Sequence, residues 1–147
     1  MVLMLKALSA AGYLAMVAGL AGLLATKSLF SLSPLVIAPQ LLAIALVVWA
    51  RVTFGRRSFH VVANPTEGGL VTSGPYRFIR HPIYAGVCLF ATASVLAHLS
   101  WTSVLWGGLI WAGIFIRIVC EERLVVIKYP EYSQYAAKTA RIVPFLF

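Results

Sequence analysis

Charged side chains are scarce in this chain of 147 residues. They make up 11% of the sequence, whereas soluble domains carry about 25%. Hydrophobic residues make up 61% and the mean hydropathy is +0.92. A soluble core of this size could not enclose so much apolar surface, so the sequence predicts one domain, residues 1–147, with lipid as its solvent.

Acidic residues are the scarcer of the two charged kinds. Four of them face twelve lysines and arginines, which gives a formal net charge of +8. Such an excess could attract nucleic acid, but the chain has no zinc-finger spacing, no RNP motif and no basic helix with a polar face. The positive-inside rule accounts for the excess in a membrane protein. We therefore predict the lipid bilayer as a partner and no nucleic acid.

Cysteine is also rare. Cys88 and Cys120 both lie in apolar stretches, where a cysteine usually behaves as a small hydrophobic side chain. Their positions predict neither a disulfide nor a metal site.

Long apolar runs are what the chain has in abundance. Four of them, at residues 7–25, 34–50, 83–99 and 101–119, have the length and composition of transmembrane helices. The first resembles a signal peptide, but its length and the three runs after it favour a membrane helix. Almost nothing separates the last two runs, which predicts a tight antiparallel hairpin. The predicted fold is an all-α integral membrane bundle of four helices.

Two polar segments flank these runs. The loop 51–82 holds five arginines, three prolines and two histidines, too many polar groups to lie unsatisfied in lipid. The tail 120–147 should first extend the fourth helix to Tyr129 and stop at Pro130. Residues 131–141 then read as a short amphipathic helix on the membrane surface.

The positive charges are distributed asymmetrically. Four spans place both termini and the 51–82 loop on the same side, and eleven of the twelve lysines and arginines fall there, leaving only Lys27 on the other. The positive-inside rule makes that side cytoplasmic.

Arg117 stands out among the charged residues. It lies in the last turn of an apolar helix, where an ionisable group is costly and usually functional. It is also four residues before Glu121, so the two share a helix face. A plainer interpretation is an ion pair that only helps the helix leave the membrane.

Several segments together resemble the isoprenylcysteine carboxyl methyltransferase and phospholipid methyltransferase superfamily. They are LVTSGPYRFIRHPIYAG (residues 70–86), Arg117, the acidic pair at 121–122, YPEYSQY (129–135) and Arg141-x-x-Pro144. The resemblance covers roughly residues 60–144. It implies an S-adenosylmethionine-dependent methyltransferase acting on a lipophilic or prenylated substrate, with carboxyl O-methylation of an isoprenylcysteine-like acceptor as the leading activity.

The resemblance also implies roles for individual residues. Arg117 would contact the substrate near the transferred methyl group. The residues implied to bind the cofactor are Gly68, Gly69, Leu70, Val71, Tyr76, His81, Pro82, Ile83, Tyr84 and Glu121.

The side chains themselves suit such a cofactor. His81 and Tyr84 are one helical turn apart and face one direction, the helix N-terminus favours an anion, and Glu121 can accept from a ribose hydroxyl or an ammonium group. A carboxylate acceptor is already ionised at neutral pH and needs only orientation, which a cation such as Arg117 can give. An amine acceptor would need a proton acceptor, with Glu121, Glu122 or His81 as candidates.

Three alternatives remain open at this point. One is N-methylation of a phospholipid amine. Another is an NADPH-dependent reductase of the sterol-reductase type, which carries a similar R-x-P-x-Y segment. The third is a non-enzymatic membrane protein whose loop binds lipid headgroups, because Arg80 and His81 taken alone could simply contact lipid phosphate.

Overall fold

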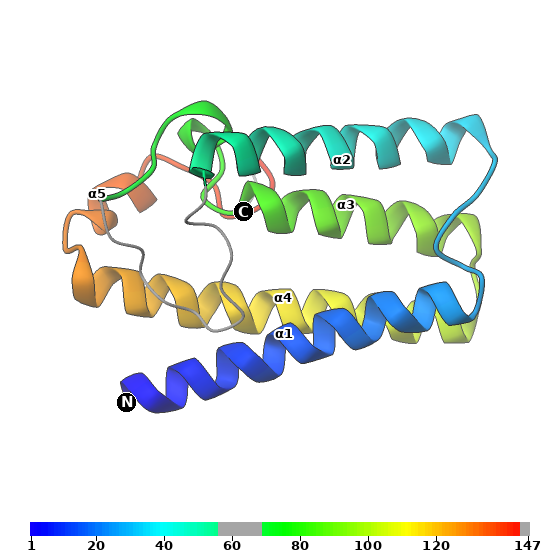
Figure 1. Cartoon of the computed structure of the whole chain (residues 1–147), viewed down its shortest axis with the longest axis horizontal. Helices are drawn as coiled ribbons and strands as arrows, with labels where there is room; N and C mark the ends of the chain where they lie inside the picture. The colour runs from blue at the N-terminus through cyan, green and yellow to red at the C-terminus, as the bar shows by residue number, and fades with distance from the viewer. Residues whose placement is uncertain (56–68, 145–147) are drawn as a thin grey trace.

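The computed structural model describes residues 1–55 and 69–144, and over these ranges the chain is helical without a β-strand (Figure 1). The predicted all-α class is therefore confirmed. The elements in chain order are α1 (Val2–Ala25), α2 (Pro34–Phe54), the 3₁₀ helix η2 (Gly74–Arg77), α3 (Pro82–Ala97), α4 (Trp101–Lys128) and α5 (Tyr132–Ala136).

Three of the helices, α1, α2 and α4, are long and apolar enough to cross a membrane. The third predicted span coincides with α3, which is apolar but has 16 residues, or a length of about 24 Å. Prolines begin both α2 and α3. Proline suits the first position of a helix because its φ is already fixed near the helical value and because the N–H that it lacks would have no partner within the helix there.

The long helices form two pairs. Figure 1 shows α1 running along α4 and α2 along α3, while α3 and α4 make the smaller contact that joins the pairs. Glycine permits the first pairing: a Cβ built on Gly113 would lie 2.5 Å from the carbonyl oxygen of Gly12. Any larger residue there would push the helices apart.

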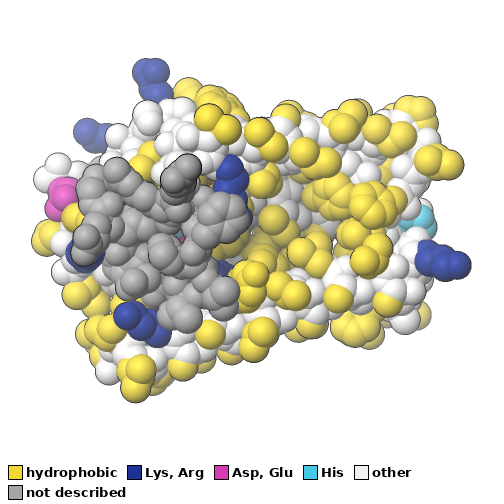
Figure 2. All heavy atoms as spheres, viewed as in Figure 1, with side chains coloured by type: hydrophobic (Ala, Val, Ile, Leu, Met, Phe, Trp, Pro, Cys, Tyr) yellow, Lys and Arg dark blue, Asp and Glu magenta, His cyan; other side chains and the backbone are white. Residues whose placement is uncertain are grey.

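The packing is that of a protein in lipid. A small core of fully buried side chains, including Leu23, Ile110, Ile114 and Ile118, lies between the helices. Large apolar side chains also cover the outside, where Figure 2 shows them along the length of the helices. Most Lys and Arg side chains visible in that view gather at the end that carries α5.

A buried polar tie holds the opposite end of the bundle. Gln40 of α2 donates from Nε2 to the carbonyl oxygen of Leu29 at 3.0 Å and to Ser94 Oγ of α3 at 3.1 Å. Ser94 Oγ also donates to Leu29 O at 2.8 Å. These bonds give Gln40 partners inside an apolar region, where an unsatisfied amide would be costly.

The tail differs from its prediction in part. As expected, α4 continues past residue 119 and ends at Lys128, just before Pro130. The helix predicted for 131–141 is wrong in extent, because α5 covers only Tyr132–Ala136. Beyond it the backbone of Ala140 and Arg141 bonds to the segment before α3: Arg80 N donates to Ala140 O at 2.7 Å and His81 N to Arg141 O at 3.0 Å. Residues 140 and 141 therefore form long-range backbone hydrogen bonds in place of the helical ones that were predicted.

Candidate active site

Arg117 is the centre of a polar cluster inside the bundle. Its side chain is 4% exposed. The guanidinium donates from Nε to the Tyr84 hydroxyl at 2.7 Å, from Nη2 to Glu121 Oε1 at 2.9 Å and from Nη1 to Ser9 O at 3.3 Å. The Tyr13 ring lies 5.2 Å from its central carbon, within cation–π range. One side chain thus joins α1, α3 and α4.

The two oxygens of Glu121 have different surroundings. Oε1 accepts from Arg117 and also from the Tyr84 hydroxyl, at 2.5 Å. Oε2 has His81 Nδ1 at 3.9 Å, which is beyond hydrogen-bond distance. The Glu121 side chain is 22% exposed, so one oxygen is held by the protein while the other can accept from a ligand.

His81 connects this cluster to a second one. It is the N-cap residue of α3, and its ring stacks on that of Tyr84 with centroids 5.7 Å apart. Its Nε2 lies 3.3 Å from Glu122 Oε1. The imidazole therefore lies between the two carboxylates of the acidic pair.

The second cluster surrounds Glu122. Arg80 donates from Nε to Oε1 at 2.8 Å, Arg141 donates from Nε to Oε2 at 3.1 Å, and the Tyr132 hydroxyl donates to Oε1 at 3.3 Å. Arg80 also donates from Nη1 to the carbonyl oxygens of Ala136, at 2.7 Å, and Thr139. Glu122 thus clamps the tail onto α4 and the start of α3, while Glu121 bonds to Arg117 and Tyr84 inside the bundle.

The central residues of both clusters, Arg117 and the two glutamates, lie within a stretch that matches a known family. The model of the isoprenylcysteine carboxyl methyltransferase family matches residues 35–127, from the start of α2 almost to the end of α4. That range is more than half of the chain.

The chain belongs to the isoprenylcysteine carboxyl methyltransferase family.

Curated relatives agree with this assignment. The chain is 31% identical over 101 residues to protein-S-isoprenylcysteine O-methyltransferase of Schizosaccharomyces pombe, covering 66% of this chain and 43% of the relative. It is 32% identical over 101 residues to protein-S-isoprenylcysteine O-methyltransferase A of Arabidopsis thaliana, covering 66% and 51%. It is also 29% identical over 116 residues to the cobalt-zinc-cadmium resistance protein CzcN of Cupriavidus metallidurans, covering 75% and 52%. The chain thus spans about half the length of these relatives. No solved structure matches it significantly.

The residues that the family resemblance had singled out lie in two groups. His81, Tyr84, Glu121 and Arg117 come together as described. Pro82 is buried and Ile83 half-buried in the first turn of α3. Each of these positions lies at the same end of the bundle.

The other group lies in the segment before α3. Gly69, Leu70 and Val71 are half-buried, and within the described ranges no hydrogen bond or ion pair links them to the Arg117 cluster. Gly68 lies outside the described residues. Tyr76 is buried in η2, where its ring packs on Phe54 at 5.4 Å and its carbonyl oxygen accepts from the Tyr135 hydroxyl at 2.6 Å.

Tyr135 keeps that bond over a wide pH range. Burial raises the pKa of its hydroxyl to about 12, so the hydroxyl stays protonated and donates at neutral pH. The bond fastens α5 to η2 and so supports the family segment from outside.

Sequence reasoning missed Ser9 and Tyr13 of α1, which contact Arg117. The Ser9 contact is made by its backbone carbonyl oxygen, which no side-chain pattern predicts, whereas Tyr13 is recognisable as an aromatic residue with a polar hydroxyl in a largely apolar helix. The sequence also suggests Glu122 as a candidate proton acceptor and as half of the acidic pair, but not as the partner of two arginines. Its partners Arg80 and Arg141 are 61 positions apart in the chain, and no local pattern places them on one carboxylate.

Proposed function

We propose that this chain is an integral membrane methyltransferase that uses S-adenosylmethionine to methylate a lipophilic acceptor, with carboxyl O-methylation of an isoprenylcysteine-like compound as its reaction. Family membership supports the reaction class. The observation that carries the proposal is Arg117, a buried cation that joins three helices beside a carboxylate with one open oxygen.

The membrane arrangement that we propose has four spans. A turn of three residues, 98–100, joins α3 to α4, so α3 runs beside a helix long enough to cross the bilayer. A length of about 24 Å is short of the ~30 Å hydrocarbon thickness, and local thinning or polar flanks would accommodate the difference. In the proposed arrangement both termini and the 51–82 loop lie in the cytoplasm and the tail lies along the surface, which the charge asymmetry of the sequence supports.

The donor set around Glu121 fits the cofactor. S-adenosylmethionine presents an ammonium group, ribose hydroxyls and a carboxylate, and when bound it supplies a methyl group carried on a sulfonium. Glu121 Oε2 would accept from the ammonium group or the ribose, because Oε1 is already held by Arg117 and Tyr84. The stacked rings of His81 and Tyr84 offer a flat surface. Residues 68–71, together with Tyr76, Pro82 and Ile83, would complete the site.

Arg117 would orient the acceptor. A carboxylate acceptor has no proton to lose, so it needs a position rather than a base. Glu121 partly neutralises the guanidinium, which lets Arg117 direct the acceptor carboxylate without suppressing its nucleophilicity. Buried Ile114 and Ile118 lie on the same helix, and the lipophilic part of the acceptor would reach the site sideways from the bilayer.

A two-stage experiment tests the proposal. Calorimetry of the purified protein in nanodiscs should show binding of S-adenosylhomocysteine and none of NADPH. Labelled S-adenosylmethionine should then methylate an N-acetyl S-prenylcysteine, giving a product that releases labelled methanol in base, as a methyl ester does. A base-stable product on phosphatidylethanolamine would indicate N-methylation instead. Binding of NADPH alone would favour a reductase, and binding of neither compound would favour a non-enzymatic role.

A further inference from the structure

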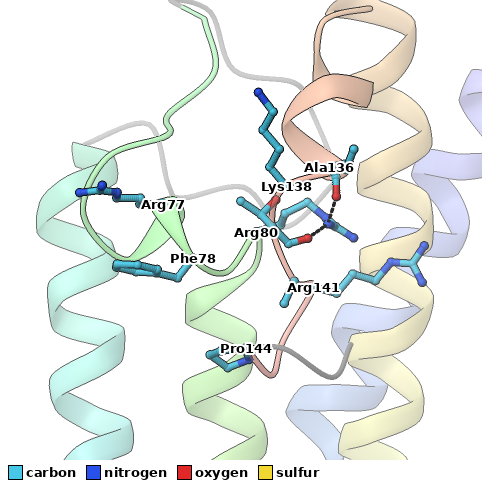
Figure 3. A pocket seen from close by; sticks show the side chains of 10 residues that line it. Arg77, Phe78, Arg80, Ala136, Lys138, Arg141 and Pro144 are labelled. Atoms are coloured by element: carbon cyan, nitrogen blue, oxygen red, sulfur yellow. Dashed lines mark hydrogen bonds between the residues drawn. The ribbon is translucent and has the colours of Figure 1, made fainter.

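A strongly basic pocket lies at the cytoplasmic end proposed above, between the segment before α3 and the tail. It has a volume of about 480 Å³. Among the described residues, four cationic side chains and no carboxylate line it: Arg77 and Arg80 come from the segment before α3, and Lys138 and Arg141 come from the tail. Figure 3 shows Arg77 and Phe78 on one side, Lys138 and Arg141 on the other and Arg80 between them.

The pocket is built on a fixed backbone. Ile79 and Ala140 form a parallel bridge, in which Arg80 N donates to Ala140 O at 2.7 Å and Ala140 N donates to Phe78 O at 3.1 Å. Arg80 is held further by Glu122 and by two carbonyl oxygens of the tail. The cations therefore project from two segments that are tied together, not from separate mobile ends.

The charges in the pocket exceed their described counter-charges. Glu122 is the one described carboxylate that pairs with any of them, and it serves both Arg80 and Arg141. Arg77 and Lys138 are exposed, and within the described ranges neither side chain lies within ion-pair distance of a carboxylate. Arg77 and Lys138 therefore contribute two positive charges to the pocket that no described carboxylate pairs. Such a concentration of charge calls for an anion.

The rim of the pocket is apolar. Phe78, which is 55% exposed, and Pro144 both line the pocket. The Arg77 guanidinium lies 5.8 Å from the Phe78 ring centroid. Cations beside exposed apolar side chains at the end of a membrane bundle are suited to the boundary between headgroups and acyl chains.

From these observations we infer that the basic pocket binds the phosphate group of an anionic phospholipid. Arg80 forms its fixed floor. The long side chains of Arg77 and Lys138 close on the phosphate from either side, and Phe78 rests among the acyl chains. This site is separate from the cluster around Arg117 and Glu121, and it does not depend on the reaction proposed there.

The test uses the double variant Arg77→Gln/Lys138→Gln and a matched control. Neither substitution removes a described hydrogen bond of the fold. The control Arg123→Gln/Lys128→Gln removes the same charge from exposed positions on α4 at the same end of the molecule. Binding to the full-length protein in phosphatidylcholine nanodiscs is titrated with phosphatidylglycerol, and separately with inorganic phosphate, without any cofactor.

We expect the pocket variant to bind phosphatidylglycerol about 10- to 30-fold more weakly, since each basic residue near an anionic surface contributes about 1 kcal/mol. The control should change the affinity by less than half as much on a logarithmic scale. The affinity for S-adenosylhomocysteine should be the same in all three proteins.

Three results would overturn the inference. An equal loss of phosphatidylglycerol affinity in the control would show that the lipid is attracted by the general positive charge and not by the pocket. Inorganic phosphate binding as tightly as the lipid would assign the site to a soluble anion. Loss of S-adenosylhomocysteine affinity in the pocket variant would make the pocket part of the cofactor site. The first two outcomes are measured on lipid and phosphate binding without cofactor, so they do not depend on whether the proposed methyl transfer occurs.

Discussion

The guanidinium of Arg117 donates from Nε to the hydroxyl of Tyr84 at 2.7 Å, although 33 positions separate them in the chain. The same hydroxyl donates to Glu121 Oε1 at 2.5 Å. Tyr84 is thus a bridge between a buried cation and the carboxylate that pairs with it. It also connects α3, whose first turn belongs to the family segment 70–86, to α4, which carries both Arg117 and Glu121.

Removing that hydroxyl should uncouple the cluster. In Tyr84→Phe the ring remains stacked on His81, while Arg117 and Glu121 each lose the hydrogen bond that joins their charged group to the Tyr84 hydroxyl. Such a bond contributes about 1.5–3 kcal/mol, so single-turnover methyl transfer should fall roughly 10- to 150-fold. Rapid-quench measurement with labelled cofactor would give the rate.

Tyr13→Phe is the matched control. Its contact with Arg117 is through the ring face, which phenylalanine retains, so the rate should change little. If Tyr84→Phe and Tyr13→Phe both transfer methyl groups at the normal rate, the Tyr84 hydroxyl has no part in the reaction.

The close pairing of α1 and α4 should depend on Gly113. A methyl group there would meet Gly12 O at 2.5 Å and Met16 N at 2.8 Å, both backbone atoms that cannot turn away. Gly113→Ala should therefore destabilise the protein by about 1–3 kcal/mol, seen as a lower midpoint of thermal unfolding in detergent. Gly108→Ala on the same helix meets nothing within 4 Å and should leave the midpoint unchanged. Equal midpoints for the two variants would contradict the pairing.

The sequence predicts most helix limits because local signals mark them. Pro34 and Pro82 begin helices and Pro130 follows the end of another, and apolar composition identifies the spans. Helix partners could not be predicted in the same way, because four apolar runs look alike to each other. The choice of α4 as partner of α1 depends on where Gly12 and Gly113 meet in space.

The candidate site also has one part that the sequence predicts and one part that it does not. The pairing of Arg117 with Glu121 follows from helical spacing, and the structure has it at 2.9 Å. The tail clamp could not be foreseen, because backbone bonds between Arg80 and Ala140 join segments with no common pattern. Those bonds also end the predicted C-terminal helix early.

That clamp should be sensitive to the charge of Glu122. Glu122→Gln replaces a carboxylate that receives Arg80, Arg141 and the Tyr132 hydroxyl, so the tail should detach more often. Losing about 1.5–3 kcal/mol would speed hydrogen exchange of the Ala140 amide roughly 10- to 150-fold. Mass spectrometry of exchanged peptides would detect it. Glu131→Gln changes an exposed carboxylate outside the clamp and should leave that exchange unchanged. Identical exchange in both variants would show that Glu122 does not hold the tail.

The proposed orientation predicts unequal access to the two ends of the bundle. Single cysteines at Ser33, in the connection before α2, and at Glu131, in the tail, both replace exposed residues. A membrane-impermeant thiol reagent on intact cells should label Ser33→Cys and spare Glu131→Cys until the cells are lysed. The native Cys88 and Cys120 are buried and provide the background. Labelling of both positions from outside would refute the four-span arrangement.

Arg117→Lys separates a role in catalysis from a role in packing. Lysine keeps the charge but loses the planar fork that reaches Tyr84, Glu121 and Ser9 O together. We expect the single-turnover rate to fall at least 10-fold while affinity for S-adenosylhomocysteine stays within about 3-fold, because Glu121 Oε2 and His81 remain in place. Arg123→Lys, at an exposed position on the same helix, should change neither quantity. Near-normal transfer by both Arg117→Lys and Arg117→Ala would remove Arg117 from the reaction. A parallel loss of rate and cofactor affinity would instead assign it to the cofactor site.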